Sequence, residues 1–195
     1  MKVFVMSGGM AKRLGGAEKG AIEICGKTVI SRILEEVKRI SKEIFLICTS
    51  RCRKTIEEAR KYDVQVILRE GRSYEEDVKW VIDNFDEGVI INGDMPFIKK
   101  ERVLIFYYLC KEMPCSFITL ALNEEGKALI SKELKLKVSA SGISCFKRGK
   151  DCWQTVVTGY SIDLFNLNTL DELIFAREKC RELTEDFGRG EDLRT

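Results

Sequence analysis

The sequence predicts an α/β fold of three layers, in which helices cover both faces of a mainly parallel, twisted sheet. Short apolar runs that favour strands alternate with helical patterns through the first half of the chain. Such alternation is typical of right-handed βαβ units. The length of 195 residues and the 45% hydrophobic content suit one continuous core. We therefore expect a single domain over residues 1–195, with ligands bound beyond the carboxyl ends of its strands.

Each expected element follows from the spacing of its apolar residues. From Val29 to Ile40, apolar side chains recur every three or four residues and form one stripe, which predicts a helix. The strands expected in the first half are Val3–Met6, Ile44–Cys48, Val64–Leu68 and Val89–Asn92. The expected helices are Val29–Ile40, Lys54–Lys61, Glu75–Phe85 and Glu101–Lys111.

The pattern is looser after Met113. We expect strands and then a helix here, at Ser116–Leu122, Ser139–Phe146, Tyr160–Leu164 and Thr169–Leu183. A polar, lysine-rich stretch between the first two of these strands is placed to cover a ligand-binding cleft. The last segment, Thr184–Thr195, is charged and is expected to form a mobile tail.

Composition narrows the classes of partner. The chain has 33 Lys and Arg against 31 Asp and Glu, so no global field would hold a nucleic acid or an anionic membrane. No apolar stretch approaches the roughly 18 residues that a membrane span needs, and Met1 leads directly into a strand without a leader. We expect a cytoplasmic protein with no membrane span and no nucleic-acid partner.

Eight cysteines in a chain without histidine could form disulfides, bind metal or fill the core. Those with apolar sequence neighbours, where a free thiol behaves as a small hydrophobic group, are Cys25, Cys48, Cys110, Cys145 and Cys180. No CxxC pair is present, and the Cys48/Cys52 and Cys110/Cys115 spacings match no common zinc pattern. We therefore expect reduced, structural cysteines, which thiol counting would test. The lack of histidine also removes the usual general base.

The most informative segment is the turn after the first strand. An apolar run is followed by a glycine-rich turn and two spaced cations, at Ser7, Gly8, Gly9, Arg13, Gly15, Gly16 and Lys19. Glycines let backbone N–H groups approach phosphate oxygens, and the cations neutralise the remaining charge. This segment predicts a polyphosphate site.

Two familiar nucleotide loops do not fit this region. The dinucleotide pattern GxGxxG is not present, and Gly26-Lys27-Thr28 is misplaced for a Walker A loop because position 21 is Ala21. A tight turn at Gly26 and Lys27, with Thr28 capping the next helix, is the expected structure instead.

Residues 7–27, SGGMAKRLGGAEKGAIEICGK, resemble the signature G-G-x-x-x-R-x-G-x-x-x-K of the MobA-like nucleotidyltransferases. These enzymes join a nucleoside monophosphate to a phosphorylated acceptor. They include the molybdenum-cofactor guanylyltransferases and the archaeal adenosylcobinamide-phosphate guanylyltransferases, which the chain resembles most. The resemblance implies a Rossmann-like nucleotidyltransferase fold, nucleotide binding by the turn, and catalytic roles for Arg13 and Lys19. The proline that often follows the lysine is Gly20 here.

Two later segments extend the resemblance. Ile90–Pro96, IINGDMP, delivers Asp94 at the carboxyl end of a strand, where the family uses an aspartate as a catalytic metal ligand. Phe165–Leu173, FNLNTLDEL, is similar to the family's N-x-N-T-x-x-D/E-L segment. Thr169 and Glu172 suit a helix-capping box, which leaves Asn168 to complete the metal shell or to orient the acceptor phosphate. The implied cofactor is Mg²⁺.

Base recognition is assigned to residues after the second and third strands. Glu70 is placed to accept both donors on the edge of a guanine ring, with Thr49 and Ser50 lining the same pocket. A solvated loop residue at Glu70 fits the sequence equally well.

Acceptor binding is assigned to Ala140 and Gly142, which resemble the alanine-glycine turn of the cobinamide enzymes. Small residues there would let a bulky acceptor approach the backbone, although an ordinary strand entry is an equal alternative. Phe146 and Trp153, if exposed, would pack on a corrin ring.

The resemblance implies transfer of GMP from GTP to adenosylcobinamide phosphate, with release of pyrophosphate, in cobalamin biosynthesis. An acceptor phosphate is already an anion at neutral pH, so the reaction needs no general base. The alternatives are a molybdopterin or other phosphorylated acceptor, and a GTP-binding regulator without catalysis. The aromatic-rich segment Phe106–Leu109 could serve an interface in a homodimer.

Overall fold

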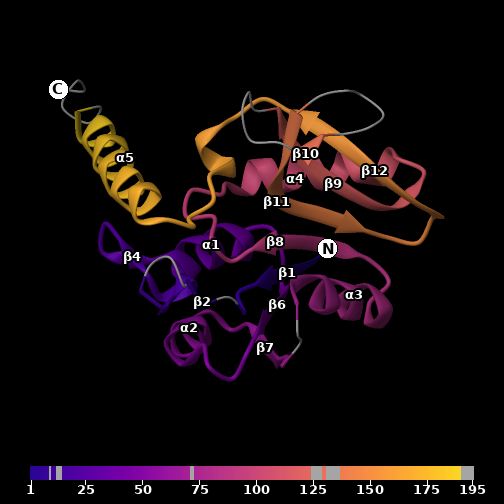
Figure 1. Cartoon of the computed structure of the whole chain (residues 1–195), viewed down its shortest axis with the longest axis horizontal. Coiled ribbons are helices and arrows are strands. Elements are labelled where there is room, and N and C mark those ends of the chain that lie inside the picture. The colour runs from indigo at the N-terminus through magenta and orange to yellow at the C-terminus, as the bar shows by residue number, and fades with distance from the viewer. Residues whose placement is uncertain (9, 12–14, 71–72, 124–128, 131–136, 190–195) are drawn as a thin grey trace.

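The computed structural model describes residues 1–8, 10–11, 15–70, 73–123, 129–130 and 137–189. The strands of the central sheet are β1 (Lys2–Met6), β6 (Glu43–Cys48), β7 (Gln65–Leu68), β8 (Gly88–Asn92), β9 (Cys115–Asn123), β10 (Leu129–Ile130), β11 (Lys137–Phe146) and β12 (Lys150–Thr158). Seven of them lie in the order β12-β9-β11-β8-β1-β6-β7, and β10 pairs with β11 (Figure 1). Within this path β11 is antiparallel to both of its neighbours, and the other pairs are parallel. The expected mainly parallel sheet is confirmed.

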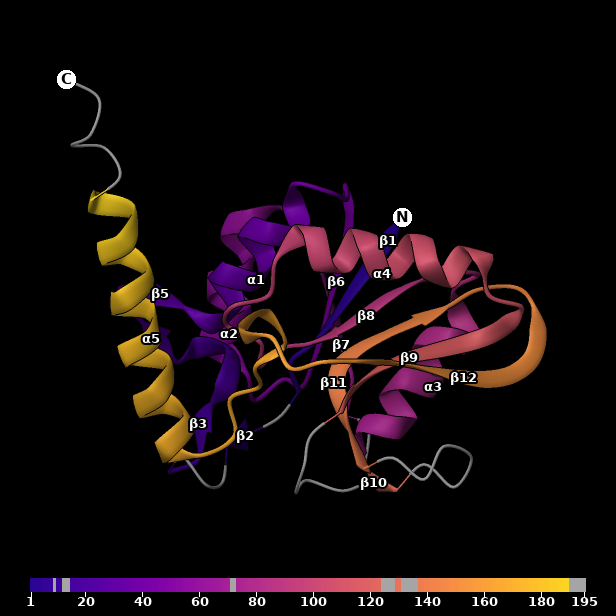
Figure 2. The same cartoon turned by 90° about the horizontal axis from the view of Figure 1, so that it is seen from above.

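Helices cover both faces of this sheet. They are α1 (Val29–Lys38), α2 (Arg53–Ala59), α3 (Tyr74–Asn84), α4 (Lys100–Glu112) and α5 (Leu170–Arg189), with 3-10 turns at Lys19–Ala21, Arg60–Tyr62 and Ile162–Leu164. Figure 2 shows α3 on one side of the sheet and α1 and α4 on the other. None of the helices in the described part of the chain is apolar over a length sufficient to cross a bilayer.

Alternation along β1 explains the two faces. Val3 and Val5 belong to the core cluster that includes helices α1 and α4, whereas Phe4 belongs to the cluster that includes Val81 of α3. All three β1 side chains are fully buried, as expected of a central parallel strand covered on both sides. The expected three-layer arrangement is therefore confirmed.

Two short hairpins connect β1 to α1. β2 (Met10–Ala11) pairs with β3 (Ala17–Glu18), and β4 (Glu23–Ile24) pairs with β5 (Lys27–Thr28). The turn of the second hairpin has positive φ at Cys25 and Gly26, one residue earlier than expected. Two consecutive positive φ angles are what a two-residue hairpin of type I′ requires.

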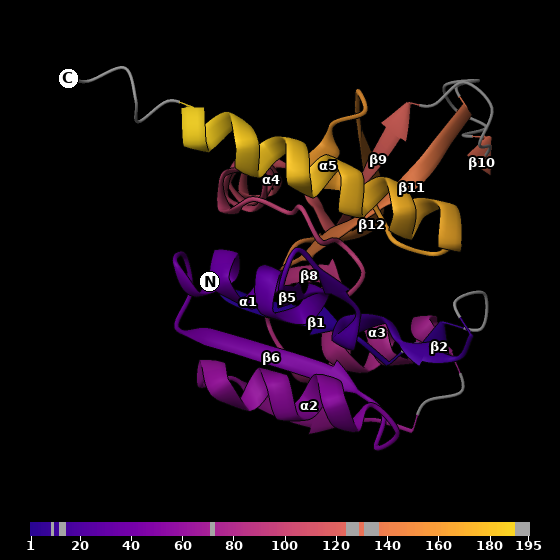
Figure 3. The same cartoon turned by 90° about the vertical axis from the view of Figure 1, so that its left-hand side faces the viewer.

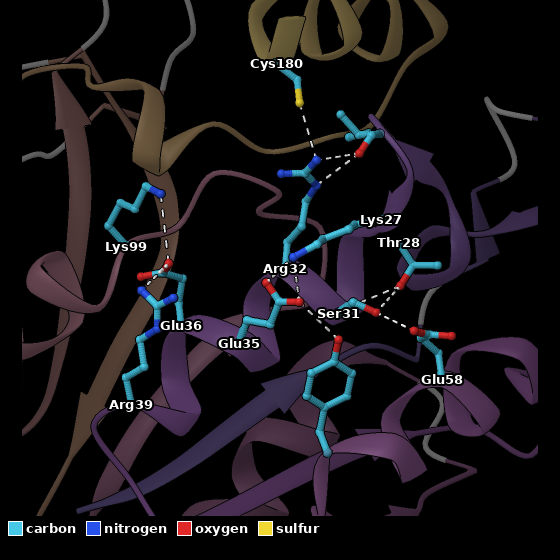
Figure 4. A network of polar contacts seen from close by, with 12 residues as sticks. Lys27, Thr28, Ser31, Arg32, Glu35, Glu36, Arg39, Glu58, Lys99 and Cys180 are labelled. Carbon is cyan, nitrogen blue, oxygen red and sulfur yellow. Dashed lines mark hydrogen bonds and ion pairs between the residues drawn. The ribbon is translucent and has the colours of Figure 1, made fainter. Parts of the chain in front are cut away.

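Polar contacts around α1 attach this helix to its surroundings (Figure 4). Thr28 Oγ1 accepts a hydrogen bond from the Ser31 N–H at 3.2 Å, which confirms the expected N-cap. Ser31 Oγ donates to Glu58 on α2 at 2.6 Å, and the Arg32 guanidinium donates to the Ile24 carbonyl at 2.5 Å. The helix is thereby attached to both α2 and the hairpin before it.

The C-terminal half differs from expectation in three places. The edge strand β12 was not expected, because its residues alternate between exposed and half-buried positions and show no apolar run. The strand expected at Tyr160–Leu164 is wrong: Ile162–Leu164 is a 3-10 turn, in which buried Asp163 accepts hydrogen bonds from Arg102 of α4. Helix α5 continues past Leu183 to Arg189, into the segment expected as a tail. Residues 190–195 lie outside the described residues.

The expectation of eight reduced cysteines is wrong for four of them. The structure pairs Cys25 with Cys180 and Cys115 with Cys152, with Cα atoms 6.4 and 4.9 Å apart. The first pair joins the β4–β5 hairpin to α5, which lies beside that hairpin (Figure 3). The second joins β9 to β12, the strand that the sequence did not reveal. The buried cysteines Cys48, Cys52, Cys110 and Cys145 are free thiols, as expected.

The aromatic-rich segment of α4 presents some of its side chains to solvent. Phe106 is buried in the core, whereas Tyr108 and Leu109 are exposed, together with Ile105. Their spacing places these exposed side chains close together on the helix. A homodimer through this surface remains a prediction.

Candidate active site

Three predicted site residues meet in space. Lys19 Nζ lies 2.8 Å from Asp94 Oδ2 and 2.5 Å from Asn168 Oδ1, so the ammonium group donates hydrogen bonds to both side chains. The side chains of Lys19 and Asp94 are 22% and 13% exposed, which places this ion pair below the surface but within reach of solvent. Partial burial makes such a pair stronger than an exposed one. These residues, far apart in the sequence, form the centre of the candidate site.

Asp94 is positioned by the end of β8. The Gly93 N–H donates to the Met6 carbonyl at 2.8 Å, which brings the ends of β8 and β1 together. A Cβ on Gly93 would lie 2.7 Å from the Ser7 Cβ and 2.8 Å from the Met6 carbonyl oxygen, so only glycine fits there. The two strands therefore deliver the turn after β1 and Asp94 to the same edge of the sheet.

Lys19 is positioned by its neighbours Glu18 and Gly20. The Glu18 carboxylate accepts hydrogen bonds from the Lys54 and Thr55 N–H groups and from Thr55 Oγ1, at 2.8 to 3.2 Å, and so binds the first turn of α2. A Cβ on Gly20 would lie 2.7 Å from Thr55 Cγ2. This close contact explains why glycine stands where the family often has proline.

Asn168 is positioned by a backbone contact and by a helix cap. The Leu167 N–H donates to the Asp94 carbonyl at 2.8 Å, which attaches the two segments directly. The Glu172 carboxylate accepts from the Asn168 and Thr169 N–H groups, and Thr169 Oγ1 accepts from the Glu172 N–H. The expected capping box is confirmed, and it holds the residue before α5 against the Asp94 loop.

Two cavities adjoin this centre. The first has a volume of about 290 Å³ and is lined by Ser7, Gly8, Lys19, Thr49 and Asp94 among others. The second, of about 550 Å³, lies beyond Asp94. Asn92 and Asp94 line both cavities, and Asn168 lines the second. This arrangement can hold two substrates whose reacting groups meet at Asp94.

Tyr74 closes the side of the first cavity. Its hydroxyl donates to Asn92 Oδ1 at 2.8 Å, so it fixes the orientation of a side chain that both cavities share. Desolvation of the hydroxyl, with a smaller contribution from the Asp94 carboxylate, raises the pKa of Tyr74 to about 12. The hydroxyl therefore keeps its proton at neutral pH and remains a hydrogen-bond donor.

The residues at the centre fit a divalent cation. Asp94 Oδ1 is buried and has no hydrogen-bond partner within the described ranges, and Asn168 supplies a second oxygen nearby. Hard cations such as Mg²⁺ prefer such oxygen ligands. The described residues contain no cluster of three or more acidic, cysteine or histidine side chains that could hold a metal alone. Ligands from a bound nucleotide would therefore have to complete the shell.

The remaining predicted nucleotide residues divide into two sets. Thr49 lines the first cavity, whereas Ser50 and Glu70 contact each other, because the Ser50 N–H donates to Glu70 Oε1 at 2.8 Å. Neither Ser50 nor Glu70 belongs to the described lining of that cavity. Gly9 and Arg13 lie outside the described residues.

The predicted acceptor residues lie near the second cavity. Ala140 lines it, and Gly142 lines a third cavity of about 540 Å³ between α3 and the antiparallel part of the sheet. Gly142 has a φ of +90°, and a Cβ there would lie 2.8 Å from Asn166 Oδ1. The expected exposure of Phe146 is wrong, because it is packed in the core on the α3 face, whereas Trp153 is exposed.

Sequence reasoning did not identify Glu18, Tyr74 and Asn92 as site residues. Glu18 acts on a helix that begins at Arg53, and Tyr74 contacts a strand end, so neither role has a local signal. Asn92 did have a local signal in the sequence, because it stands two residues before Asp94 at the end of an apolar strand.

The chain belongs to the MobA-like NTP transferase family, whose model matches residues 3–189. The fold and the site thus define a nucleotidyltransferase. Among curated relatives, the adenosylcobinamide-phosphate guanylyltransferase of Methanocaldococcus jannaschii is 27% identical in an alignment that covers 90% of this chain and 95% of that protein. The probable molybdenum cofactor guanylyltransferase of Aquifex aeolicus is 31% identical in an alignment that covers 69% of this chain and 66% of that protein.

Solved structures support the fold. The molybdopterin-guanine dinucleotide biosynthesis protein A of Archaeoglobus fulgidus has a TM-score of 0.69 at 20% identity, covering 93% of this chain and 100% of that one. The 4-diphosphocytidyl-2C-methyl-D-erythritol synthase of Anaerococcus prevotii has a TM-score of 0.70 at 13% identity, covering 92% and 95%. The expected Rossmann-like nucleotidyltransferase fold is confirmed.

Proposed function

We propose that the protein transfers GMP from GTP to adenosylcobinamide phosphate and releases pyrophosphate. The observation that carries this proposal is the meeting of Lys19, Asp94 and Asn168 where two cavities adjoin. An acceptor phosphate oxygen in the second cavity would attack the α-phosphorus of a nucleotide in the first. The bond from the α-phosphorus to the bridging oxygen breaks, and pyrophosphate leaves.

The nucleotide would lie across the carboxyl ends of β1 and β8. The backbone of Gly8 and Gly9, with the Arg13 side chain, would hold the β- and γ-phosphates. Lys19 would leave its contacts with Asp94 and Asn168 to bind the α-phosphate and stabilise the extra charge of the transition state. Ser7 Oγ, which is buried without a partner among the described residues, is available to a phosphate oxygen or a water.

Mg²⁺ is the cofactor that this proposal requires. Asp94 and Asn168 would hold it, and when bound it would neutralise phosphate charge and draw the two substrates together. In its absence, the Lys19 ammonium group compensates the charge of Asp94.

Support for the cobinamide acceptor comes from coverage. The relative from Methanocaldococcus jannaschii aligns over nearly all of both chains. Molybdopterin is the second candidate, favoured by the higher identity of the shorter Aquifex aeolicus match.

Pyrophosphate release tests the proposal directly. The protein is incubated with Mg²⁺, each of the four NTPs in turn, and either adenosylcobinamide phosphate, molybdopterin or a sugar phosphate. We expect release to require GTP and adenosylcobinamide phosphate together. If pyrophosphate is released with GTP only when molybdopterin is present, molybdopterin is the acceptor in place of adenosylcobinamide phosphate. Tight GTP binding without release for any acceptor would favour a regulator instead.

A further inference from the structure

The second cavity has an aromatic rim that no assigned role uses. Tyr160, in the loop after β12, and Phe175, on α5, line the cavity, yet the two residues remain 53% and 42% exposed. Large aromatic side chains gain most from burial, so two of them half-exposed at a cavity mouth favour a ligand with an apolar surface. The cavity also reaches Asp94 and Asn168 at its inner end.

Phe175 is held in a fixed row of rings. Its ring centroid lies 5.3 Å from that of Phe165, which in turn lies 6.0 Å from that of buried Phe97. Phe175 is also one helical turn beyond Glu172, whose carboxylate binds the Asn168 N–H at 2.6 Å. One rigid element therefore sets the distance between the aromatic rim and the reaction centre.

Trp153 does not share this placement. It lines the third cavity, between α3 and strands β9, β11 and β12, and its indole N–H donates to Thr119 Oγ1 at 2.9 Å. The described lining of that cavity contains none of Lys19, Asp94 and Asn168. A molecule stacked on Trp153 would therefore lie in a cavity that does not include the Lys19, Asp94 and Asn168 centre.

We propose that Tyr160 and Phe175 pack against the ring system of the phosphorylated acceptor and so determine acceptor specificity. The proposal rests on the proposed function and moves the expected ring contact from Phe146 and Trp153 to the α5 side. The acceptor lies with its phosphate at the Lys19, Asp94 and Asn168 centre and its ring system against the two aromatic side chains. A small phosphorylated molecule would bind less effectively, because it cannot contact the centre and the two aromatic side chains at the same time.

Steady-state kinetics with a matched control test this assignment. We expect Phe175→Ala to raise the KM for adenosylcobinamide phosphate by about tenfold, as loss of one aromatic contact implies. The KM for GTP should stay within about twofold, because Phe175 does not line the first cavity. Phe175→Tyr should restore the acceptor KM. Trp153→Ala, which removes a more exposed aromatic residue outside the second cavity, should leave both KM values unchanged.

The outcomes separate this proposal from the proposed function. The assignment of Tyr160 and Phe175 would be overturned if wild type, Phe175→Ala and Tyr160→Ala had equal KM values for the acceptor. It would also be overturned if only Trp153→Ala raised that KM. Melting temperatures identify a variant that has failed to fold, in which case the other aromatic variant decides. If the wild-type protein releases no pyrophosphate with adenosylcobinamide phosphate, the proposed function is overturned. The same variants are then measured with whichever other acceptor the protein uses. If it uses none, both proposals fail.

Discussion

Lys19 is the side chain that joins the segments of the candidate site. Its ammonium group donates to Asp94 and Asn168, which come from the end of β8 and the segment before α5. Lys19→Met and Asp94→Asn should each lower kcat by about 10² to 10³, as expected when one preorganised electrostatic group is lost. Pyrophosphate release at saturating substrate concentrations measures this effect.

Lys27 provides the control for the lysine variant. It lies on β5, its Nζ pairs with Glu35 at 2.8 Å, and it does not line the first cavity. Lys27→Met should therefore keep the wild-type rate, since exposed ion pairs contribute little.

A near-wild-type rate for Asp94→Asn would refute the role of Asp94 as a metal ligand.

Glu70 is the predicted determinant of base specificity. The Ser50 hydroxyl and, to a smaller extent, the Ser50 N–H lower the pKa of its carboxyl group, so the group is ionised at neutral pH and can accept from a guanine edge. Glu70→Gln should weaken GTP binding far more than ATP binding. Dissociation constants for both nucleotides, measured by calorimetry, make ATP the internal control. Equal loss for both nucleotides would contradict the role.

The sequence predicted the residues of the centre and the capping box beside Asn168, but not the other supports. Asp94 and Asn168 stand in local motifs at the end of a strand and the start of a helix, where a short pattern identifies them. Glu18 is hydrogen-bonded to Thr55, and Tyr74 is hydrogen-bonded to Asn92. Both partners are distant in sequence, so these contacts depend on the tertiary structure. A capping pattern could predict Glu172, whereas no pattern could predict that Glu18 binds α2.

At the scale of the elements, the central strands in the first half of the chain were predictable because each is an almost uninterrupted apolar run. Strands β1, β6 and β8 are buried on both faces, which produces such runs. Edge strand β12 has one partner in the described sheet and many exposed positions, so its pattern is weak. The missed strand also concealed Cys152, because its pairing with Cys115 depends on the register of β12 against β9.

The cysteine pairs give a prediction at this scale. Denatured, unreduced protein should react as four thiols, and reduced protein as eight. Cys25→Ser removes the link between the hairpin and α5 and should lower stability by about 2 to 4 kcal/mol. Thiol titration and chemical denaturation measure these two effects.

The control for Cys25→Ser is the wild-type protein under reducing conditions, in which the disulfides are opened without a substitution. Cys48→Ser is not a suitable control, because Cys48 is buried. If the reductant removes the difference in stability between wild type and Cys25→Ser, the link accounts for it. Eight reactive thiols without reduction would contradict both pairs.

At the scale of the whole molecule, the sheet separates two tasks. The parallel strands β1, β6 and β8 end at the first cavity, and the segments around β11 and α5 surround the second. The cavities adjoin at Asn92 and Asp94, where the parallel part of the sheet meets the antiparallel strand β11. A change of strand direction thus coincides with the place where the two substrates would meet.

Removal of Mg²⁺ distinguishes a catalytic from a structural role for the metal. Within the described chain, no cluster of three acidic, cysteine or histidine ligands exists to hold a structural ion. A chelator should therefore abolish pyrophosphate release and leave the melting temperature of the ligand-free protein unchanged. Added Mg²⁺ should restore the rate. A fall in melting temperature with the chelator would indicate a structural metal.

The contact between Lys19 and Asn168 also has a consequence for synthesis of the protein. These residues are separated by 149 positions, and the Leu167 N–H completes the attachment to the Asp94 loop. A ribosome-bound chain that ends before Leu167 can contain the entire glycine-rich turn and β8 without Asn168 or α5. The candidate site therefore cannot assemble until the segment before α5 has emerged from the ribosome.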